Sequence, residues 1–169
     1  NRGDHVIVET EQGLGFGTVA VDPVLYQTKK NDKPLKKIYR LATKKDMPDV
    51  LKLIKELAVF EREPDAVIID ESVLEKEGFG EHPMFTCFVA ESISGIVGMA
   101  LVFMRFSTWK GKALHLEDLI VNEAYRGQGI GYALYKKVME YAKELGVNRV
   151  QWEVLDWNIP AIEFYEKSG

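Results

Sequence analysis

The residues with the clearest chemical meaning form a glycine-rich turn between an apolar run and a long amphipathic segment. They read Arg126-Gly127-Gln128-Gly129-Ile130-Gly131. Glycines let a ligand approach the backbone, and a helix that begins here would direct free N–H groups and its positive dipole end at the same place. The turn therefore predicts a binding site for a diphosphate, with a plain strand-to-helix connection as the alternative. A dinucleotide-binding fingerprint needs a different spacing of its glycines and a parallel βαβ unit, and the sequence shows neither.

Strand and helix patterns alternate on both sides of this turn. The predicted strands cover residues 38–42, 85–91, 96–106, 114–121 and 147–155. Helical spacing of apolar residues, with Thr43 as a cap before the first helix, predicts helices at 47–58, 71–77, 130–145 and 158–169. Gly78 is expected to stop the second helix and Gly146 the third. The pattern predicts a mixed α/β fold.

The composition limits the partners that the chain can bind. With 169 residues, of which 46% are hydrophobic, the chain is long enough for one compact domain with a core. The formal charge of -4 argues against a nucleic-acid surface, which needs clustered Lys and Arg. No apolar stretch approaches the roughly 18 to 20 residues that span a bilayer, and no signal peptide is recognisable. We therefore expect a soluble, cytoplasmic protein without a membrane partner.

The cysteine and the histidines predict neither a disulfide nor a metal site. Cys87 is the single cysteine, and it lies in an apolar run that indicates an inert core position. His82 and His115 lack cysteine companions and the spacing of metal ligands, so no metal is predicted. His115 stands two residues before Glu117, which leaves an assisting role in proton transfer as a further hypothesis.

The turn and several separate segments resemble one superfamily of enzymes. Arg126, Gly129 and Gly131 match the signature of the GCN5-related N-acetyltransferase (GNAT) superfamily: Arg or Gln, two residues, Gly, one residue, then Gly or Ala. Within it, the chain resembles the spermidine/spermine and thialysine acetyltransferases at residues 53–58, 78–83, 116–118, 125–127 and 157–158. Two stretches, residues 107–111 and 154–158, are nearer to the thialysine type.

The resemblance covers residues 38–169 and implies a mixed, mostly antiparallel sheet flanked by helices. It also implies acetyl-coenzyme A (acetyl-CoA) as donor, a small cationic amine (thialysine-, diamine- or polyamine-like) as acceptor, and a homodimer. Two alternatives stay open. One is a regulatory or coenzyme A-sensing module without turnover, and the other is an N-acetyltransferase that acts on proteins or peptides.

The resemblance assigns the catalytic chemistry to Glu117 and Tyr165. An alkylammonium must lose a proton before it attacks a thioester, which at pH 7 costs about 3.4 pKa units, or roughly 4.6 kcal/mol. Glu117 matches the family's substrate-contacting glutamate and would accept that proton directly or through water, while Tyr165 matches the general acid. A solvated strand glutamate and a tyrosine that anchors a helix are the respective alternatives.

The same resemblance assigns residues to the two substrates. Those matching donor-binding positions are Leu119, Ile120, Val121, Arg126, Gly127, Gln128, Gly129, Ile130, Gly131, Tyr132, Asn158, Ile159, Pro160 and Ala161. Those matching amine-binding positions are Phe60, Glu61, Glu117, Gln151, Trp152 and Glu153. Phe60 and Trp152 lie on apolar faces, so plain core positions are their alternative. Asp118 and Asp156 would add negative potential that attracts a cation.

Residues 1–34 precede the domain, which we place at 35–169. Two β-prone runs, Val6 to Thr10 and Thr18 to Asp22, flank alternating glycines, and a polar stretch at 27–34 ends in proline. This predicts an N-terminal β-hairpin extension and a linker. Residues 3–17 also resemble the start of the PSP1 family of bacterial regulatory proteins. GNAT members normally continue into a last pair of strands, so we expect no C-terminal strand pair here, and the hairpin to cover the exposed sheet edge instead.

Overall fold

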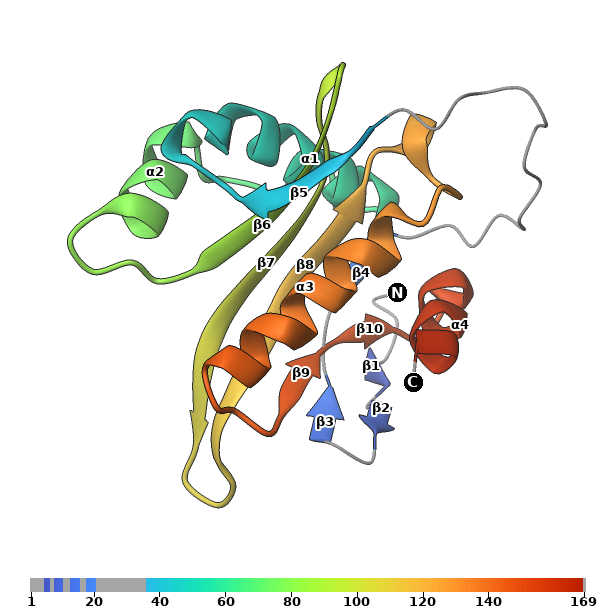
Figure 1. The fold of residues 1–169 in the computed structure, drawn as a ribbon. Helices are drawn as coiled ribbons and strands as arrows, with labels where there is room; N and C mark the ends of the chain where they lie inside the picture. The colour runs from blue at the N-terminus through green and yellow to red at the C-terminus, as the bar shows by residue number, and fades with distance from the viewer. Residues whose placement is uncertain (1–4, 7, 11–12, 16–17, 21–35, 169) are drawn as a thin grey trace.

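The computed structural model describes residues 5–6, 8–10, 13–15, 18–20 and 36–168, and a twisted sheet runs through its centre (Figure 1). Antiparallel neighbours form most of this sheet, in the order β5-β6-β7-β8. Their bounds are β5 Ile38–Leu41, β6 Thr86–Ser92, β7 Gly95–Ser107 and β8 Gly111–Val121. On its outer edge β8 pairs in parallel with two short strands, β9 (Val150–Trp152) and β4 (Thr18–Ala20).

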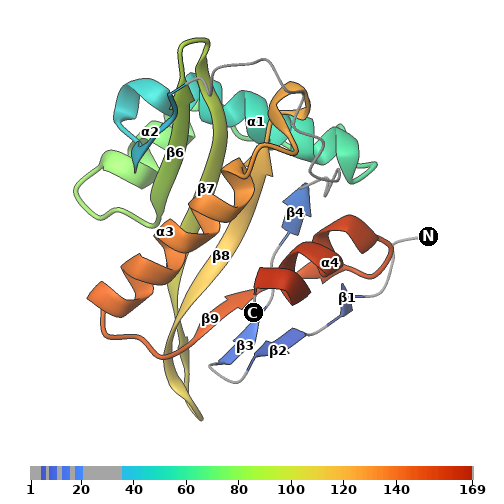
Figure 2. The same cartoon turned by 45° about the vertical axis from the view of Figure 1, so that its right-hand side comes forward.

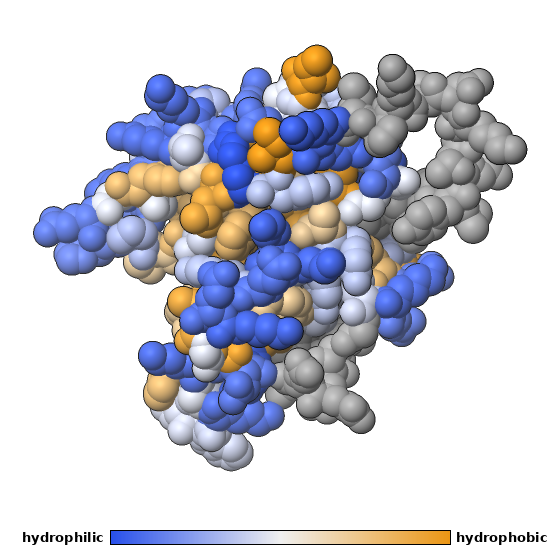
Figure 3. Space-filling model, in the orientation of Figure 1, coloured by the Kyte–Doolittle hydropathy of each residue, from blue (hydrophilic) through white to orange (hydrophobic). Residues whose placement is uncertain are grey.

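Helices cover both faces of the sheet (Figures 1 and 2). α1 (Met47–Phe60) and α2 (Glu71–Phe79) pack on one face, and α3 (Ile130–Glu144) packs on the other. α4 (Ile159–Ser168) follows β10 (Val154–Leu155) and joins the core of α3. The outward side of α3 is mostly hydrophilic (Figure 3), as expected of a helix with one apolar face. The mixed, mostly antiparallel fold that the sequence predicted is confirmed.

β8 supplies side chains to two separate cores. Leu116 and Leu119 are fully buried among the residues of α3 and α4, whereas Ile120 is buried among those of α1 and α2. Alternate residues of a strand point to opposite faces of the sheet, so β8 lies between the layer of α1 and α2 and the layer of α3 and α4. Side chains from either layer can therefore reach it.

The alternation along β8 is interrupted by a β-bulge at Glu117. Leu101 of β7 pairs with Asp118, and the next residue, Val102, pairs with Leu116, so Glu117 is an extra residue without a partner. Leu116 faces α3, and the bulge turns both Glu117 and Asp118 to the α1 face of the sheet. The bulge thereby places two carboxylates side by side on one face.

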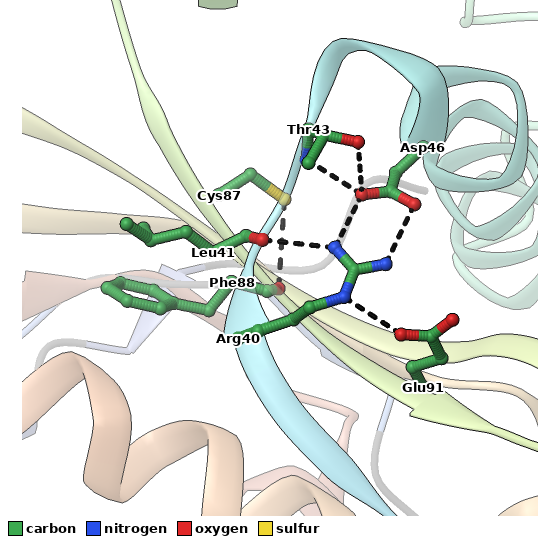
Figure 4. Close-up of polar contacts among 7 residues, drawn as sticks. All are labelled: Arg40, Leu41, Thr43, Asp46, Cys87, Phe88 and Glu91. Carbon is green, nitrogen blue, oxygen red and sulfur yellow. Dashed lines mark hydrogen bonds and ion pairs between the residues drawn. The ribbon is translucent and has the colours of Figure 1, made fainter.

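An ion-pair network fixes the start of α1 (Figure 4). Arg40 of β5 donates through Nε to Glu91 at 2.8 Å and through Nη1 to Asp46 at 2.7 Å. Asp46 also accepts from the backbone N–H of Thr43 at 2.7 Å; Thr43 is the N-cap of a short 3₁₀ turn, Lys44–Asp46, and Asp46 itself is the N-cap of α1. The hydrogen bonds from Arg40 lower the pKa of Asp46 to about 2. This network ties the beginning of α1 to the sheet, and so fixes where its other end lies.

Two predicted boundaries are wrong. α2 does not stop at Gly78 but runs on to Phe79. A Cβ on Gly78 would lie 2.5 Å from the Phe85 ring, so the glycine serves close packing rather than a helix end. The strand predicted at 147–155 is interrupted at Glu153, which separates β9 from β10. Gly146 has φ +68°, so its prediction as the left-handed end of α3 is confirmed.

The N-terminal strands pair differently from the prediction. β2 (Val8–Thr10) forms a hairpin with β3 (Gly13–Gly15), within the stretch expected to be only a connection. β4, the second predicted strand, pairs with β8 instead, and β1 (His5–Val6) pairs with β10. A hairpin is therefore present, but its second strand is β3. The linker predicted at 27–34 lies outside the described residues.

Two further features concern membranes and metals. Among the described residues, no helix combines the length and the apolar character needed to cross a bilayer. The same residues contain no group of three His, Cys, Asp or Glu side chains that could hold a metal ion.

Cys87 is buried, and burial raises the pKa of its thiol.

Candidate active site

The glycine turn, residues 126–131, joins β8 to α3 through two residues in the left-handed region. φ is +74° at Gly127 and +79° at Gly129, where other side chains would be strained. Gly129 is the N-cap of α3 and offers no side-chain acceptor, and the first turn of α3 carries no acidic residue. Among the described residues no side chain caps the first amides of α3, and with the helix dipole these amides favour an external anion.

Glu56 on α1 holds the end of β8 and the glycine turn in place. It accepts from the Asn122 side chain at 3.0 Å and from the Glu123 backbone at 2.8 Å. Its Oε1 also lies 3.6 Å from Nη2 of Arg126, whose Nε donates to the Val121 carbonyl at 2.9 Å. The guanidinium of Arg126 is thus engaged within the protein and fixes the turn relative to α1.

The outer edge of β8 changes partner beside this turn. β9 pairs with residues 114–116 and then leaves β8 to continue as β10, which pairs with β1. From Asp118 to Ile120 the partner is β4, with Val19 opposite Leu119. The backbone that the sequence assigned to the donor therefore lies where β9 has diverged, and in this structure β4 pairs with it.

Three carboxylates meet on the α1 face of the bulge, and we refer to Glu61, Glu117 and Asp118 as the acidic cluster. Glu61 is the C-cap of α1. Burial, and then the charge of Glu117, raise its pKa to about 7. Burial raises the pKa of Asp118 to about 7 as well, with contributions from Glu117 and Glu61. Within the described part of the chain, Oε1 of Glu61 is buried without a hydrogen-bond partner, so no side chain of that part compensates its charge there.

Aromatic and cationic side chains pack together around Phe60 and Arg62, the chain neighbours of Glu61. The Phe60 ring lies 5.7 Å from the Arg126 guanidinium and 5.9 Å from the Trp157 ring. Arg62 stacks its guanidinium 4.5 Å from the centre of the Trp157 ring, and its backbone has φ +63°, which is uncommon for a non-glycine residue. These contacts bring together the end of α1, the glycine turn and the loop before α4.

Tyr165 is buried on the other face, among aromatic rings. Its ring stacks on Trp152 with centroids 4.6 Å apart, and Tyr135 lies 6.2 Å away. Only 2% of Tyr165 is exposed, and its hydroxyl has no hydrogen-bond partner among the residues that the structure describes. Burial raises the pKa of Tyr165 well above its usual range, which keeps the phenol protonated. A protonated hydroxyl without a partner can donate to a bound molecule.

The residues of β9 divide between the two faces. Trp152 is 1% exposed and belongs to the core of α3, so the structure does not bring its side chain to the acidic cluster. Gln151 pairs with His115 across the parallel ladder and shares the α1 face with it. Oε1 of Gln151 is buried without a partner. Glu153, between β9 and β10, is partly buried.

The remaining predicted donor residues lie at the starts of α3 and α4. Asn158 is buried and accepts from the backbone of Ala161 at 3.3 Å, which caps α4. Ile159 is exposed and Pro160 partly buried. On α3, Ile130 and Gly131 are buried and Tyr132 is half-exposed. Gln128, in the turn, accepts from Lys37 at 2.6 Å.

Sequence reasoning missed part of this arrangement. Asp118 was expected only to add potential, whereas it is a member of the acidic cluster. The signal was present: two consecutive acidic residues inside an apolar strand break its period-two alternation, as a bulge does. Arg62 and Trp157 received no role, because their contact joins segments far apart in the chain.

Comparison with known proteins points to one family. The model of the acetyltransferase (GNAT) family matches residues 45–169. A thialysine N-epsilon-acetyltransferase from Bos taurus is 42% identical over 138 residues, covering 77% of this chain and 81% of that protein. A spermidine/spermine N(1)-acetyltransferase-like protein 1 from Homo sapiens is 37% identical over 73% of this chain and 19% of that protein. The solved structure of an aminoglycoside N-acetyltransferase in complex with CoA shares the fold, with a TM-score of 0.67 and 15% identity over 82% of this chain and 90% of that one.

Proposed function

This chain belongs to the acetyltransferase (GNAT) family, and we propose that it transfers the acetyl group of acetyl-CoA to a small cationic amine of the thialysine, diamine or polyamine kind. The enzyme is an N-acetyltransferase. The kind of amine follows the relatives, which include thialysine N-epsilon-acetyltransferases and a spermidine/spermine N(1)-acetyltransferase-like protein.

The observation that supports a cationic acceptor is the acidic cluster itself. Glu61 and Asp118 have raised pKa values because burial and neighbouring negative charges disfavour their ionised forms. A bound cation would remove part of that penalty, whereas an anion or an apolar group would not. Charge and burial at the cluster therefore select for an ammonium group over other small acceptors.

The residues around the glycine turn suit the donor. Acetyl-CoA supplies an activated acetyl group through its thioester. The uncapped amides at the start of α3 would hold its diphosphate, and Gly127 and Gly129 leave the backbone accessible there. Asn158 to Ala161 at the start of α4, and the β8 edge from Leu119 to Val121, would align the rest of the molecule. The unpartnered hydroxyl of Tyr165 is a further polar group for it to satisfy.

Two side chains would manage the protons. Glu117 accepts the proton of the ammonium group directly or through water, which generates the nucleophilic amine. Tyr165 remains protonated because burial raises its pKa, so it can donate to the departing thiolate. Tyr165 lies in the core of α3 and α4, and Glu117 lies on the other face of β8, so the amine and the thioester would have to meet at the edge of β8 between them. No covalent intermediate on the protein is needed.

We further propose a homodimer in the cytoplasm, where acetyl-CoA is supplied by metabolism. The β7–β8 hairpin carries Phe106 and Trp109, which are 70% and 93% exposed, and a second copy would cover this apolar surface. Light scattering on the purified chain should then give about twice its mass of 19.2 kDa. A monomeric mass at micromolar concentration would contradict the dimer.

The proposal is tested by thiol release from acetyl-CoA with thialysine, spermidine, spermine and a lysine-containing peptide. We expect turnover with the small amines and little with the peptide. Binding of CoA without turnover on any amine would support a sensing module instead. Turnover on the peptide alone would support a protein acetyltransferase.

A further inference from the structure

His115 is a buried side chain beside Glu117 that the proposed function leaves without a role. Its side chain is 7% exposed, and Nε2 lies 3.3 Å from Oε2 of Glu117. The imidazole also packs against the Phe103 ring, with centroids 4.8 Å apart. The ring is therefore held in one orientation on the α1 face, two positions before the bulge residue.

The two ring nitrogens of His115 have different surroundings. Nδ1 is buried and no described residue offers it a hydrogen-bond partner, while Nε2 faces a carboxylate. A neutral imidazole keeps its proton on the nitrogen that has an acceptor, so Nε2 carries the hydrogen and can donate it to Glu117. The separation of 3.3 Å is long for such a bond, and contacts of this kind commonly tighten only when substrate is bound.

Glu117 needs a positioning partner because of its place in the fold. It is the extra residue of a bulge, and its side chain is 53% exposed. A glutamate with three rotatable bonds and no fixed neighbour spends little time in any one orientation. A proton acceptor that is held in place needs no further ordering when the amine arrives.

We propose that His115 is the positioning residue of Glu117. Its Nε2–H holds Oε2, which leaves Oε1 directed at the reacting ammonium group. The inference rests on the proposed function, since it assigns a role within the same acidic site. His115 transfers no proton in this account, because its acceptor nitrogen, Nδ1, faces away from the carboxylate.

Two substitutions separate positioning from packing. His115→Phe keeps an aromatic ring against Phe103 but removes the donor, whereas His115→Gln retains a side-chain N–H. We expect His115→Phe to lower kcat about 10- to 100-fold, the effect of losing one hydrogen bond to a charged group, with the KM for acetyl-CoA unchanged. His115→Gln should keep most of the activity. On a Glu117→Gln background, His115→Phe should cost less than about threefold, because the residue to be positioned is gone.

A matched control removes a polar contact away from the site. Thr86→Val deletes the hydroxyl that lies 3.2 Å from the Tyr141 hydroxyl, between β6 and α3. It should lower the melting temperature and leave kcat unchanged. An equal kcat in the wild type and His115→Phe would overturn the positioning role but not the proposed function. The same holds if the losses of kcat from His115→Phe and Glu117→Gln multiply in the variant that carries both changes. Absence of turnover by the wild type with every amine would overturn the proposed function itself.

Discussion

Three carboxylates that share one side of a β-bulge cannot all ionise freely when two of them are largely removed from water. Glu61 and Asp118 show this as pKa values raised to about 7. The charges of the acidic cluster are unfavourable in the empty protein, but a cationic substrate would neutralise them. Active sites often sacrifice stability for function in this way. The acidic cluster is therefore expected to destabilise the empty enzyme.

Glu61→Gln tests this compromise through its pH dependence. The folded-state pKa of Glu61 lies above its unfolded value near 4.5, so the folded protein keeps a proton that the unfolded chain loses. Stability from this group is present below about pH 4.5 and is lost as the pH rises to about 7. The variant should thus melt at a higher temperature than the wild type at pH 8 and at the same temperature at pH 4. Its KM for the amine should rise.

Glu166→Gln on α4 is the control, because it removes an equal charge from an exposed position. It should change neither the melting temperature nor the KM. A destabilised Glu61→Gln at pH 8 would show that the carboxylate is compensated in the folded protein, and would remove the physical argument for a cationic acceptor.

The family resemblance assigned residues to the proposed site without giving the geometry that the structure shows. Glu61 and Glu117 were expected near the amine, and the structure brings them together. Trp152 was expected there too, but it faces the opposite core, since it is paired with Leu116 and shares its side of the sheet. Which face a strand residue occupies depends on register, and register across distant strands is not contained in local sequence.

At the scale of elements, the junction of β8, the glycine turn and α3 is the part that would hold the donor. Two left-handed glycines reverse the chain, and the uncapped start of α3 follows at once. Close packing supports it: a Cβ on Gly98 of β7 would lie 3.2 Å from side chains of Ile130 and Leu134. The start of α3 can therefore sit directly over the sheet.

Gly129→Ala and Gly146→Ala form a matched pair at the two ends of α3. Their φ angles are +79° and +68°, and an added Cβ would meet nothing within 4 Å at either place. Both changes should cost about 1 to 2 kcal/mol of folding stability through backbone strain. Only Gly129→Ala should also weaken CoA binding, by about tenfold, because its Cβ would project from the proposed diphosphate site. Calorimetric titration with CoA measures this, and equal affinities in both variants would exclude the turn as the site.

The main elements followed from local patterns, and the exceptions have physical causes. Strands β5 to β8 and helices α1, α3 and α4 were all expected, because alternation and helical spacing are local properties. α2 continues through Gly78, because this glycine is needed for close packing against the Phe85 ring and does not end the helix. The bulge at Glu117 could not be predicted without knowing which residues of β7 pair with which residues of β8.

At the scale of the whole molecule, two described strands of the N-terminal extension, β1 and β4, pair with strands of the domain, although we propose the extension and the domain as separate segments of the chain. β4 pairs with the stretch of β8, Asp118 to Ile120, that would align the donor. One edge of a strand cannot form ladders with two partners at once. If the donor binds there, β4 must first leave that edge of β8. The free energy needed to break this pairing reduces the apparent affinity for the donor.

Val19→Pro in the full chain tests this competition, because proline removes a backbone donor and disfavours a ladder within the sheet. It should tighten CoA binding by about threefold or more. Glu9→Pro is the control, since it interrupts β2, which pairs with β3 rather than with β8. Both affinities come from calorimetric titration. Unchanged or weaker binding by Val19→Pro would contradict the competition between β4 and the donor.

The pairing of β4 could not be predicted from sequence. It joins residues about one hundred positions apart, and the β-prone run itself only indicates that a strand forms. The hypothesis was that the hairpin covers an exposed sheet edge, but the hairpin β2–β3 forms a separate two-stranded sheet and only β4 pairs with the edge of β8.

The central claim is that Glu117 and Tyr165 act on an amine and an acetyl donor that meet at the edge of β8, Glu117 as the proton acceptor and Tyr165 as the proton donor. Its most direct test is the rate of thiol release from acetyl-CoA with thialysine, measured for the wild type, Glu117→Gln and Tyr165→Phe; Cys87 is buried and should add little background. We expect turnover by the wild type and a loss of about 100-fold or more in each variant. Tyr165→Phe should keep the melting temperature of the wild type, because its hydroxyl has no partner to lose. Wild-type rates in both variants, or no release by the wild type, would contradict the account.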